Sequence, residues 1–309
     1  MKRGNELLQG DSNRPNANVK VRKLMSIKQI FFIVLMSLPL AACIKPISLT
    51  NTHNVRTELG VLEIALVKKR NPVVVLENGL GTDMMLWDAV FREISKNNTV
   101  IAYNRAGHGN SSAPKAERSG QNIVSELRGL LKSQGLQPPY VLVGHSAGGL
   151  YMQLFARQYP AEVAGLVLVD STNPKQFSGP SALENQSLLV RAVEFWYGVF
   201  RSATVKDEYR LLPDTGRQML RLPSIPGRRV TLVQAAHPVS VAGASSAENA
   251  VLNLYLNKLK TDEVSSYPGC SVVTADTGHS VPSEMPGLIV KAASKYLRAD
   301  IKDVGSPSE

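Results

Sequence analysis

Short runs of apolar, largely β-branched residues recur along most of this 309-residue chain, and stretches with the period of a helix separate most of them. Strands that are apolar on both faces and alternate with helices are typical of a parallel sheet covered on both sides. The alternation therefore predicts an α/β fold. We expect strands at 61–67, 73–76, 100–103, 140–143, 166–169, 230–233 and 271–274, and helices at 121–131, 150–157, 247–259 and 288–297.

One interval breaks this alternation. Residues 171–227 separate two consecutive predicted strands, and loops of that length without structure of their own are uncommon in compact domains. We therefore expect a helical cap inserted at about 171–227, directly after the strand that ends at Asp170. Its stretch SLLVRAVEFWYGVF, residues 187–200, is apolar nearly all round a helix. That pattern fits either the cap's own core or the wall of an apolar substrate pocket.

The N-terminal 42 residues are typical of a leader rather than of a folded domain. An apolar segment at 30–40 follows Lys28 and precedes small residues, which is the layout of a secretory signal peptide and too short to span a bilayer. The sequence LAAC at 40–43 resembles the lipobox of bacterial lipoproteins, which implies removal of residues 1–42 and diacylation of Cys43. The alternative is a conventional signal peptide in which Cys43 is incidental.

These interpretations divide the chain into a leader (1–42), an anchor or linker (43–56), an α/β domain (57–298) and a polar tail (299–309). They predict a protein of the cell envelope that is attached to the membrane through its lipid. The residue after Cys43 is Ile44 rather than Asp. This resembles the pattern of lipoproteins that are sorted to the outer membrane in a Gram-negative organism. With Cys43 acylated, Cys270 would have no intrachain disulfide partner, so the core must hold the domain together.

The net charge of +10 does not indicate a nucleic-acid partner. Half of the excess lies in the leader, and the rest is scattered without a basic run interleaved with aromatic residues. A scattered excess of this kind is typical of a solvated surface.

A serine lies between two glycines where a predicted strand runs directly into a predicted helix, in the sequence GHSAG at 144–148. Such a turn forces the intervening residue into a strained backbone conformation, and the flanking glycines relieve the clashes. Ser146 would then lie beside a helix N-terminus, whose free N–H groups favour developing negative charge. The position suits a nucleophile.

A serine nucleophile needs a base, and the base needs an orienting acid. His279 follows the last predicted strand on a loop that we expect to lie over Ser146, and it is the predicted base. Asp170 is the predicted acid by elimination, because the end of the next strand, TLVQAAHPVS, has no carboxylate and Asp276 is only three residues from His279. A role for Asp170 in capping the inserted segment is the alternative.

Acyl transfer also needs donors for an oxyanion. We expect one to be the backbone N–H of Ala147, directly after the serine. The second is expected in the loop of PVVVLENGLGTD, where Gly79 and Gly81 let the backbone approach and Leu80 offers its N–H. These glycines could instead serve a tight turn only.

The order of serine, acid and histidine resembles that of the α/β-hydrolase superfamily over about residues 57–297. The sequence ENGLG resembles the family's oxyanion loop HG, with Asn78 in place of His. YNRAGHGNS resembles the segment DRxGxGxS, with Asn104 in place of Asp, and GHSVPSEMP resembles the terminal histidine loop. The resemblance implies hydrolysis through an acyl-enzyme, with an ester as the default small-molecule substrate and neither a metal nor an organic cofactor.

Three functions fit these residues. The first is a serine hydrolase, esterase- or lipase-like, that cleaves a carboxylic ester or a related acyl bond through Ser146, His279 and Asp170. The second is a catalytically silent binding lipoprotein with the same fold, because fold alone does not establish activity. The third is an acyltransferase that uses the same three residues. The intact serine, histidine and acid favour an enzyme over a silent binding protein.

Overall fold

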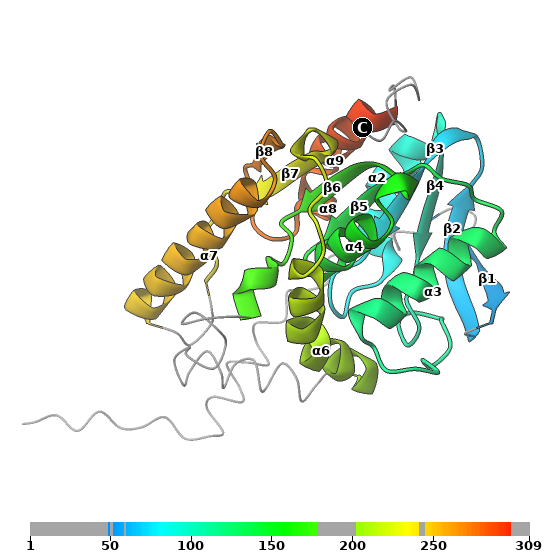
Figure 1. The fold of residues 1–309 in the computed structure, drawn as a ribbon, viewed down its shortest axis with the longest axis horizontal. Coiled ribbons are helices and arrows are strands. Elements are labelled where there is room, and N and C mark those ends of the chain that lie inside the picture. The colour runs from blue at the N-terminus through cyan, green and yellow to red at the C-terminus, as the bar shows by residue number, and fades with distance from the viewer. Residues whose placement is uncertain (1–48, 50–51, 59, 178–201, 241–244, 298–309) are drawn as a thin grey trace, which may run out of the picture. The chain divides into compact units, whose positions relative to one another are not determined.

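The computed structural model describes residues 49, 52–58, 60–177, 202–240 and 245–297. In this part of the chain, eight strands form one sheet in the order β1-β2-β4-β3-β5-β6-β7-β8 (Figure 1). β2 is antiparallel to both of its neighbours, whereas all other pairs are parallel. The strands are β1 Thr52–Thr57, β2 Gly60–Val67, β3 Arg70–Glu77, β4 Asn98–Tyr103, β5 Tyr140–His145, β6 Val163–Val169, β7 Val230–Ala235 and β8 Ser271–Ala275.

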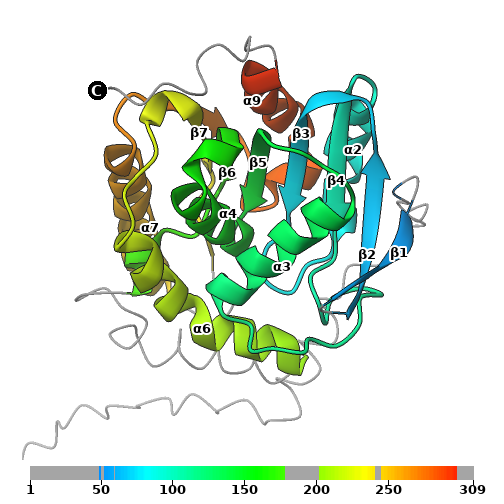
Figure 2. The same ribbon diagram turned by 45° about the vertical axis from the view of Figure 1, so that its right-hand side comes forward.

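Helices cover both faces of the sheet (Figure 2). They are α2 Asp88–Ser95, α3 Gly120–Ser133, α4 Ala147–Gln158, α6 Ala203–Leu220, α7 Ser246–Ser266, α8 Val281–Glu284 and α9 Pro286–Leu297, with 3-10 turns η1 Met84–Trp87, η2 Pro160–Glu162, η3 Pro174–Phe177 and η6 Gly227–Arg229. One core cluster joins the sheet to α3 and α4, and a second joins it to α2 and α9. Every residue of β4 and β5 is buried, because each of these strands has helices on both sides.

The predicted α/β architecture is confirmed, and the strands and helices for which the sequence predicts ranges are present with ends that differ by a few residues, except that α7 continues seven residues beyond the predicted end at 259. The linker predicted at 43–56 is wrong at its C-terminal end, because the sheet already begins at Thr52 with β1. β1 is an exposed edge strand without an apolar run, and main-chain pairing with β2 alone holds it in the sheet. Hydrophobic periodicity has no signal for a strand of that kind.

In the described part of the interval 171–227, where the sequence predicts a cap, the chain forms η3 and α6. Ser202 caps the N-terminus of α6, and its side chain accepts a hydrogen bond from the N–H of Val205. α6 contacts α3 and α4, and Thr215 Oγ1 accepts a hydrogen bond of 3.1 Å from the N–H of Gly120. The apolar stretch 187–200, the leader 1–42 and Cys43 lie outside the described residues.

The parallel strands β3, β5, β6, β7 and β8 end at the same edge of the sheet, so the segments that follow them meet there. β4 and β5 lie on opposite sides of β3, which makes this edge the place where the strand order reverses. Ligands of open α/β sheets bind outside the carboxyl ends of the strands at such a reversal.

Candidate active site

Ser146 occupies a strained turn between β5 and α4. Its backbone angles are φ 54° and ψ −124°, which a residue with a side chain rarely adopts. A Cβ at Gly144 would lie 2.6 Å from the carbonyl oxygen of Gly148, and a Cβ at Gly148 would lie 2.4 Å from that of Asn78. Both glycines are therefore required for the close approach of α4 to the sheet.

Backbone hydrogen bonds hold this turn against β6. The N–H of Ser146 donates to the carbonyl of Val169 at 3.1 Å, and the carbonyl of Ser146 accepts from the N–H of Thr172 at 3.0 Å. Ala147 is the first residue of α4, so its N–H has no acceptor within the helix. The loop that carries Leu80 passes beside the serine, because a Cβ at Gly79 would lie 3.3 Å from the Cβ of Ser146.

His279 and Asp170 form a close pair at the same edge. His279 Nδ1 lies 2.6 Å from Asp170 Oδ2, and the N–H of Ala235 donates to Asp170 Oδ1 at 3.2 Å. Asp170 itself has a φ of 38°, so its backbone is also in the left-handed region. Burial opposes its ionisation, but the hydrogen bond and charge of His279, together with Lys260 and the Ala235 N–H, lower the pKa of Asp170 overall.

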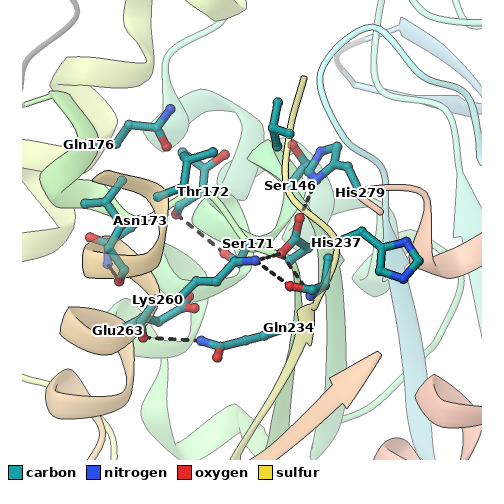
Figure 3. A pocket seen from close by; sticks show the side chains of 15 residues that line it. Ser146, Ser171, Thr172, Asn173, Gln176, Gln234, His237, Lys260, Glu263 and His279 are labelled. Atoms are coloured by element: carbon teal, nitrogen blue, oxygen red, sulfur yellow. Dashed lines mark hydrogen bonds and ion pairs between the residues drawn. The ribbon is translucent and has the colours of Figure 1, made fainter. Parts of the chain in front are cut away.

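A cavity of about 320 Å³ brings the predicted residues together (Figure 3). Ser146, Asp170 and His279 all line it. The other lining residues are Ser171, Thr172, Asn173, Gln176, Gln234, Ala235, His237, Val239, Leu256, Leu259, Lys260 and Glu263. Most of these lining residues carry hydrogen-bonding side chains, and Val239, Leu256 and Leu259 add apolar surface.

His145 supports the loop that carries His279. Its Nε2 lies 2.8 Å from the carbonyl oxygen of His279, and the two rings lie 4.6 Å apart. Burial, reinforced by the neighbouring His279, lowers the pKa of His145 to about 4. His145 is therefore neutral at pH 7 and donates from Nε2 to that carbonyl, because a carbonyl oxygen can only accept.

Asp276, the carboxylate that the sequence places nearest to His279, pairs with another histidine. Its Oδ1 lies 3.0 Å from His237 Nε2, and its side chain is 91% exposed. Geometry therefore favours Asp170 as the partner of His279. The sequence analysis assigned no role to His145, Lys260 and Glu263, which lie around the pair. His145 is part of the GHSAG sequence, whereas the positions of Lys260 and Glu263 on α7 carry no motif that could have marked them.

The family model for the alpha/beta hydrolase fold matches residues 72–262, more than half of the chain. This chain belongs to the α/β-hydrolase family. Among curated proteins, YqjL of Bacillus subtilis is 35% identical over 97 residues, which is 31% of this chain and 38% of YqjL. The match thus covers less than half of that relative's length.

Solved structures show the same fold. A hydrolase from Pseudomonas aeruginosa has a TM-score of 0.52 and 18% identity, with 82% of this chain and 100% of that chain covered. The N-formylmaleamic acid deformylase of Pseudomonas putida S16 has a TM-score of 0.54 and 17% identity, with 79% and 99% covered. At these identities the likeness shows the fold alone, whereas family membership supports a hydrolase-type function.

The two asparagines that depart from the α/β-hydrolase motifs have structural partners in this chain. Asn104 Nδ2 donates to Glu63 Oε2 at 2.6 Å, and its Oδ1 accepts from the N–H of Met84 at 2.8 Å. Asn78 Nδ2 donates to the carbonyl of Tyr103 at 2.8 Å. An aspartate at 104 could not donate to the Glu63 carboxylate, so the amide is the residue that this neighbourhood requires.

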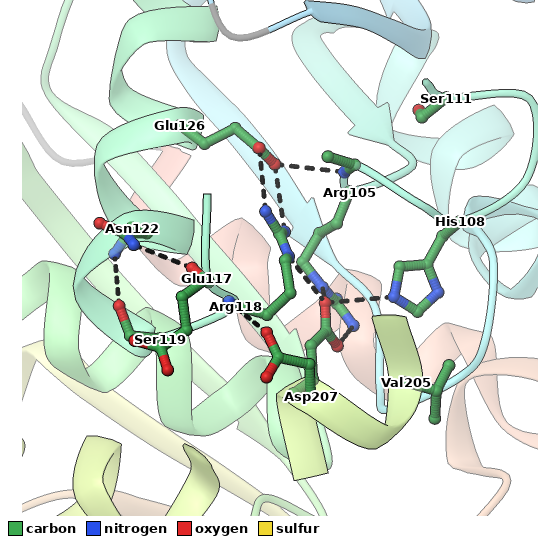
Figure 4. A network of polar contacts seen from close by, with 12 residues as sticks. Arg105, His108, Ser111, Glu117, Arg118, Ser119, Asn122, Glu126, Val205 and Asp207 are labelled. Carbon is green, nitrogen blue, oxygen red and sulfur yellow. Dashed lines mark hydrogen bonds and ion pairs between the residues drawn. The ribbon is translucent and has the colours of Figure 1, made fainter. Parts of the chain in front are cut away.

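Arg105 belongs to a network of ionisable side chains that includes His108, Arg118 and Glu126 (Figure 4), and it also holds the loop after β3 in this α/β-hydrolase. Arg105 is 1% exposed and donates from Nη1 to Glu77 Oε1 at 2.6 Å and to the carbonyl of Asn78 at 2.8 Å. From Nη2 it donates to the carbonyl of Gly79 at 3.1 Å and to Glu208 Oε2 at 2.7 Å. Arg105 therefore connects the segment before Leu80 to α6, so that the loop beside Ser146 and the inserted region share one anchor.

Within the part of the chain that the structure describes, no group of three or more His, Cys, Asp or Glu side chains is placed to hold a metal ion. Across the same residues, no helix is both long and apolar enough to cross a bilayer.

Proposed function

We propose that this α/β-hydrolase is a serine hydrolase that cleaves a carboxylic ester or a related acyl bond through an acyl-enzyme. One observation carries the proposal: the close pair of His279 and Asp170 lines the same cavity as Ser146, which lies in a strained turn at a helix N-terminus. A nucleophile, a base and an acid at one edge are the parts that such a reaction needs.

In the proposed reaction, Ser146 Oγ attacks the carbonyl carbon of the substrate while His279 Nε2 takes the hydroxyl proton. The bond to Nδ1 keeps Asp170 against the ring and stabilises the imidazolium that forms. Collapse of the tetrahedral intermediate expels the leaving group with the proton from His279. Water, activated by the same imidazole, then releases the acid and regenerates Ser146.

The N–H groups of Leu80 and Ala147 are proposed to bind the oxyanion of that intermediate. Ala147 is at the start of α4, where the helix dipole favours negative charge. Leu80 follows Gly79, whose close approach to Ser146 leaves no space for a Cβ without displacement of His145 or Ser146. The Arg105 bonds to the carbonyls of Asn78 and Gly79 support this part of the loop.

A fluorophosphonate probe tests the proposal directly, because it reacts covalently with an activated serine. We expect labelling of the wild-type protein and loss of labelling in Ser146→Ala. Ser171→Ala is the matched control, because Ser171 also lines the cavity but its hydroxyl accepts a hydrogen bond from Gln153 at 3.1 Å. Absence of labelling in folded wild-type protein would favour a silent binding protein, and labelling of Ser146→Ala would exclude Ser146 as the nucleophile.

Kinetics on p-nitrophenyl esters of increasing acyl length tests the acid and defines the substrate range. Asp170→Asn should lower kcat by about 10³- to 10⁴-fold, by analogy with loss of the orienting acid in other serine hydrolases. Asp276→Asn is the control and should leave kcat unchanged, because Asp276 pairs with His237 at the surface. Equal loss in both variants would contradict the proposed role of Asp170.

The proposed location in the cell envelope rests on the sequence of the leader. If Cys43 is acylated after cleavage, Cys43→Ser should accumulate as an unprocessed protein without fatty acid. Metabolic labelling with a palmitate analogue, followed by membrane fractionation, checks this. A mature, acylated Cys43→Ser protein would contradict the lipid anchor and leave the hydrolase proposal intact.

A further inference from the structure

A lysine lies against the acid of the proposed catalytic pair, and none of the roles assigned above uses it. Lys260 on α7 has its Nζ 3.5 Å from Asp170 Oδ1, on the oxygen that His279 leaves free (Figure 3). The same Nζ donates to the carbonyl of Ala235 at 2.5 Å. Because the N–H of Ala235 donates to Asp170 Oδ1 at 3.2 Å, Lys260, Ala235 and Asp170 contact one another in a closed ring.

We propose that Lys260 is a positioning residue, whose ammonium group holds the second carboxylate oxygen of Asp170 and limits how strongly that carboxylate binds the imidazolium form of His279. The proposal rests on the proposed function, because it assumes that His279 is the base. Its geometric basis is that the two carboxylate oxygens have separate partners, with Oδ2 on the imidazole and Oδ1 on Lys260 and the Ala235 N–H.

Several other titratable groups lie near the pair of His279 and Asp170, and their charges differ from that of Lys260. His145 at the end of β5 is neutral at pH 7, since its pKa is lowered to about 4, mainly by burial. Glu263, one turn after Lys260 on α7, is protonated near neutrality, since burial raises its pKa to about 8. His237 and Asp276 pair with each other at the surface. Among the described residues that line the cavity, Lys260 is the one lysine or arginine.

The electrostatic consequence follows from the sign of each charge. An ionised Asp170 attracts the positive charge of the His279 ring in its imidazolium form. The ammonium of Lys260 offsets part of that field, while its contact still keeps Asp170 ionised. Lys260 thus lets Asp170 orient the imidazole while it weakens the attraction between the carboxylate and the imidazolium.

The experiment measures kcat/KM against pH for the wild-type protein and four variants. Lys260→Met and Lys260→Gln remove the charge, and the glutamine retains a donor toward the carbonyl of Ala235. Both should move the acidic limb of the profile to higher pH by about 0.5–1 unit, the size expected for one partly exposed charge near the pair. Lys260→Arg should keep the wild-type limb, and so should Lys258→Met, which removes an exposed cation from the same helix.

An independent measurement separates this inference from the proposed function. The pKa of the His279 ring, followed by NMR in a Ser146→Ala background, should rise by about the same amount in Lys260→Met or Lys260→Gln. Failure of the wild-type protein to hydrolyse any ester or bind the probe would refute the proposed function, whatever the ring titration shows. The role of Lys260 would be overturned if the wild-type protein is active but Lys260→Met or Lys260→Gln shifts neither the pH profile nor the titration of the His279 ring.

Discussion

Replacement of Glu263 by glutamine is expected to stabilise this protein by an amount that grows with pH. Glu263 is 4% exposed, and its Oε1 has no hydrogen-bond partner among the described residues. Burial is the main cause that raises the pKa of its carboxyl to about 8, and the negative charge of Asp170 adds to the effect. A buried carboxyl of this kind is tolerated because it stays protonated.

The magnitude follows from the difference in proton binding between the folded and unfolded chain. The unfolded carboxyl titrates near 4.5, so between about pH 4.5 and 8 the folded state holds a proton that the unfolded state has released. The free energy of unfolding therefore falls as the pH rises through this range. At about 1.4 kcal/mol for each pKa unit, the free energy of unfolding that Glu263 costs the protein approaches ~5 kcal/mol at pH 8 and is below ~1 kcal/mol at pH 5.

Glutamine has nearly the shape of the protonated carboxyl and cannot ionise, so Glu263→Gln should recover much of this cost. We expect an increase in the free energy of unfolding of about 3 kcal/mol at pH 8 and less than about 1 kcal/mol at pH 5. Urea unfolding of the purified protein at both pH values measures it. Glu284→Gln is the control, since Glu284 is exposed on α8 and its replacement should change little at either pH. A difference between wild type and Glu263→Gln that is independent of pH would refute the reasoning.

Four further predictions concern the buried network, the turn at the serine and a glycine on α3. Arg105→Met should lower the free energy of unfolding by about 3–5 kcal/mol in urea titrations, because Glu77 and Glu208 would both lose the buried guanidinium that lies between them. Despite burial, Arg105 and His108 hold the pKa of Glu208 well below its usual range. The ionised Glu208 therefore contributes fully to stability above about pH 4.5, and this contribution is lost on acidification below that value. Thermal unfolding at several acidic pH values measures the loss. Gly148→Ala should abolish probe labelling, whereas Gly129→Ala on α3, with open space around the new methyl, should raise stability by about 0.5–1 kcal/mol. Unaltered labelling of Gly148→Ala would contradict the steric argument.

Local patterns were sufficient for the architecture of the domain. Apolar, β-branched runs predicted each parallel strand, because a strand buried on both faces has to be apolar throughout. The strand-to-helix turn at Ser146 was predictable, because a side chain at position 144 or 148 would clash with the nearby backbone. β1 escaped prediction, since a polar edge strand is stabilised by main-chain pairing and not by its side chains.

What the sequence alone determined is thus the set of elements and the chemical type of each predicted site residue. Only the tertiary structure decided which side chains meet. The sequence favoured Asp170 over Asp276 by elimination only, and the structure gave the contact of Asp170 with the ring of His279 and brought Lys260 and Glu263 to the same cavity from α7. The physical reason is that charge pairing and desolvation depend on distance and burial in space, and separation along the chain encodes neither.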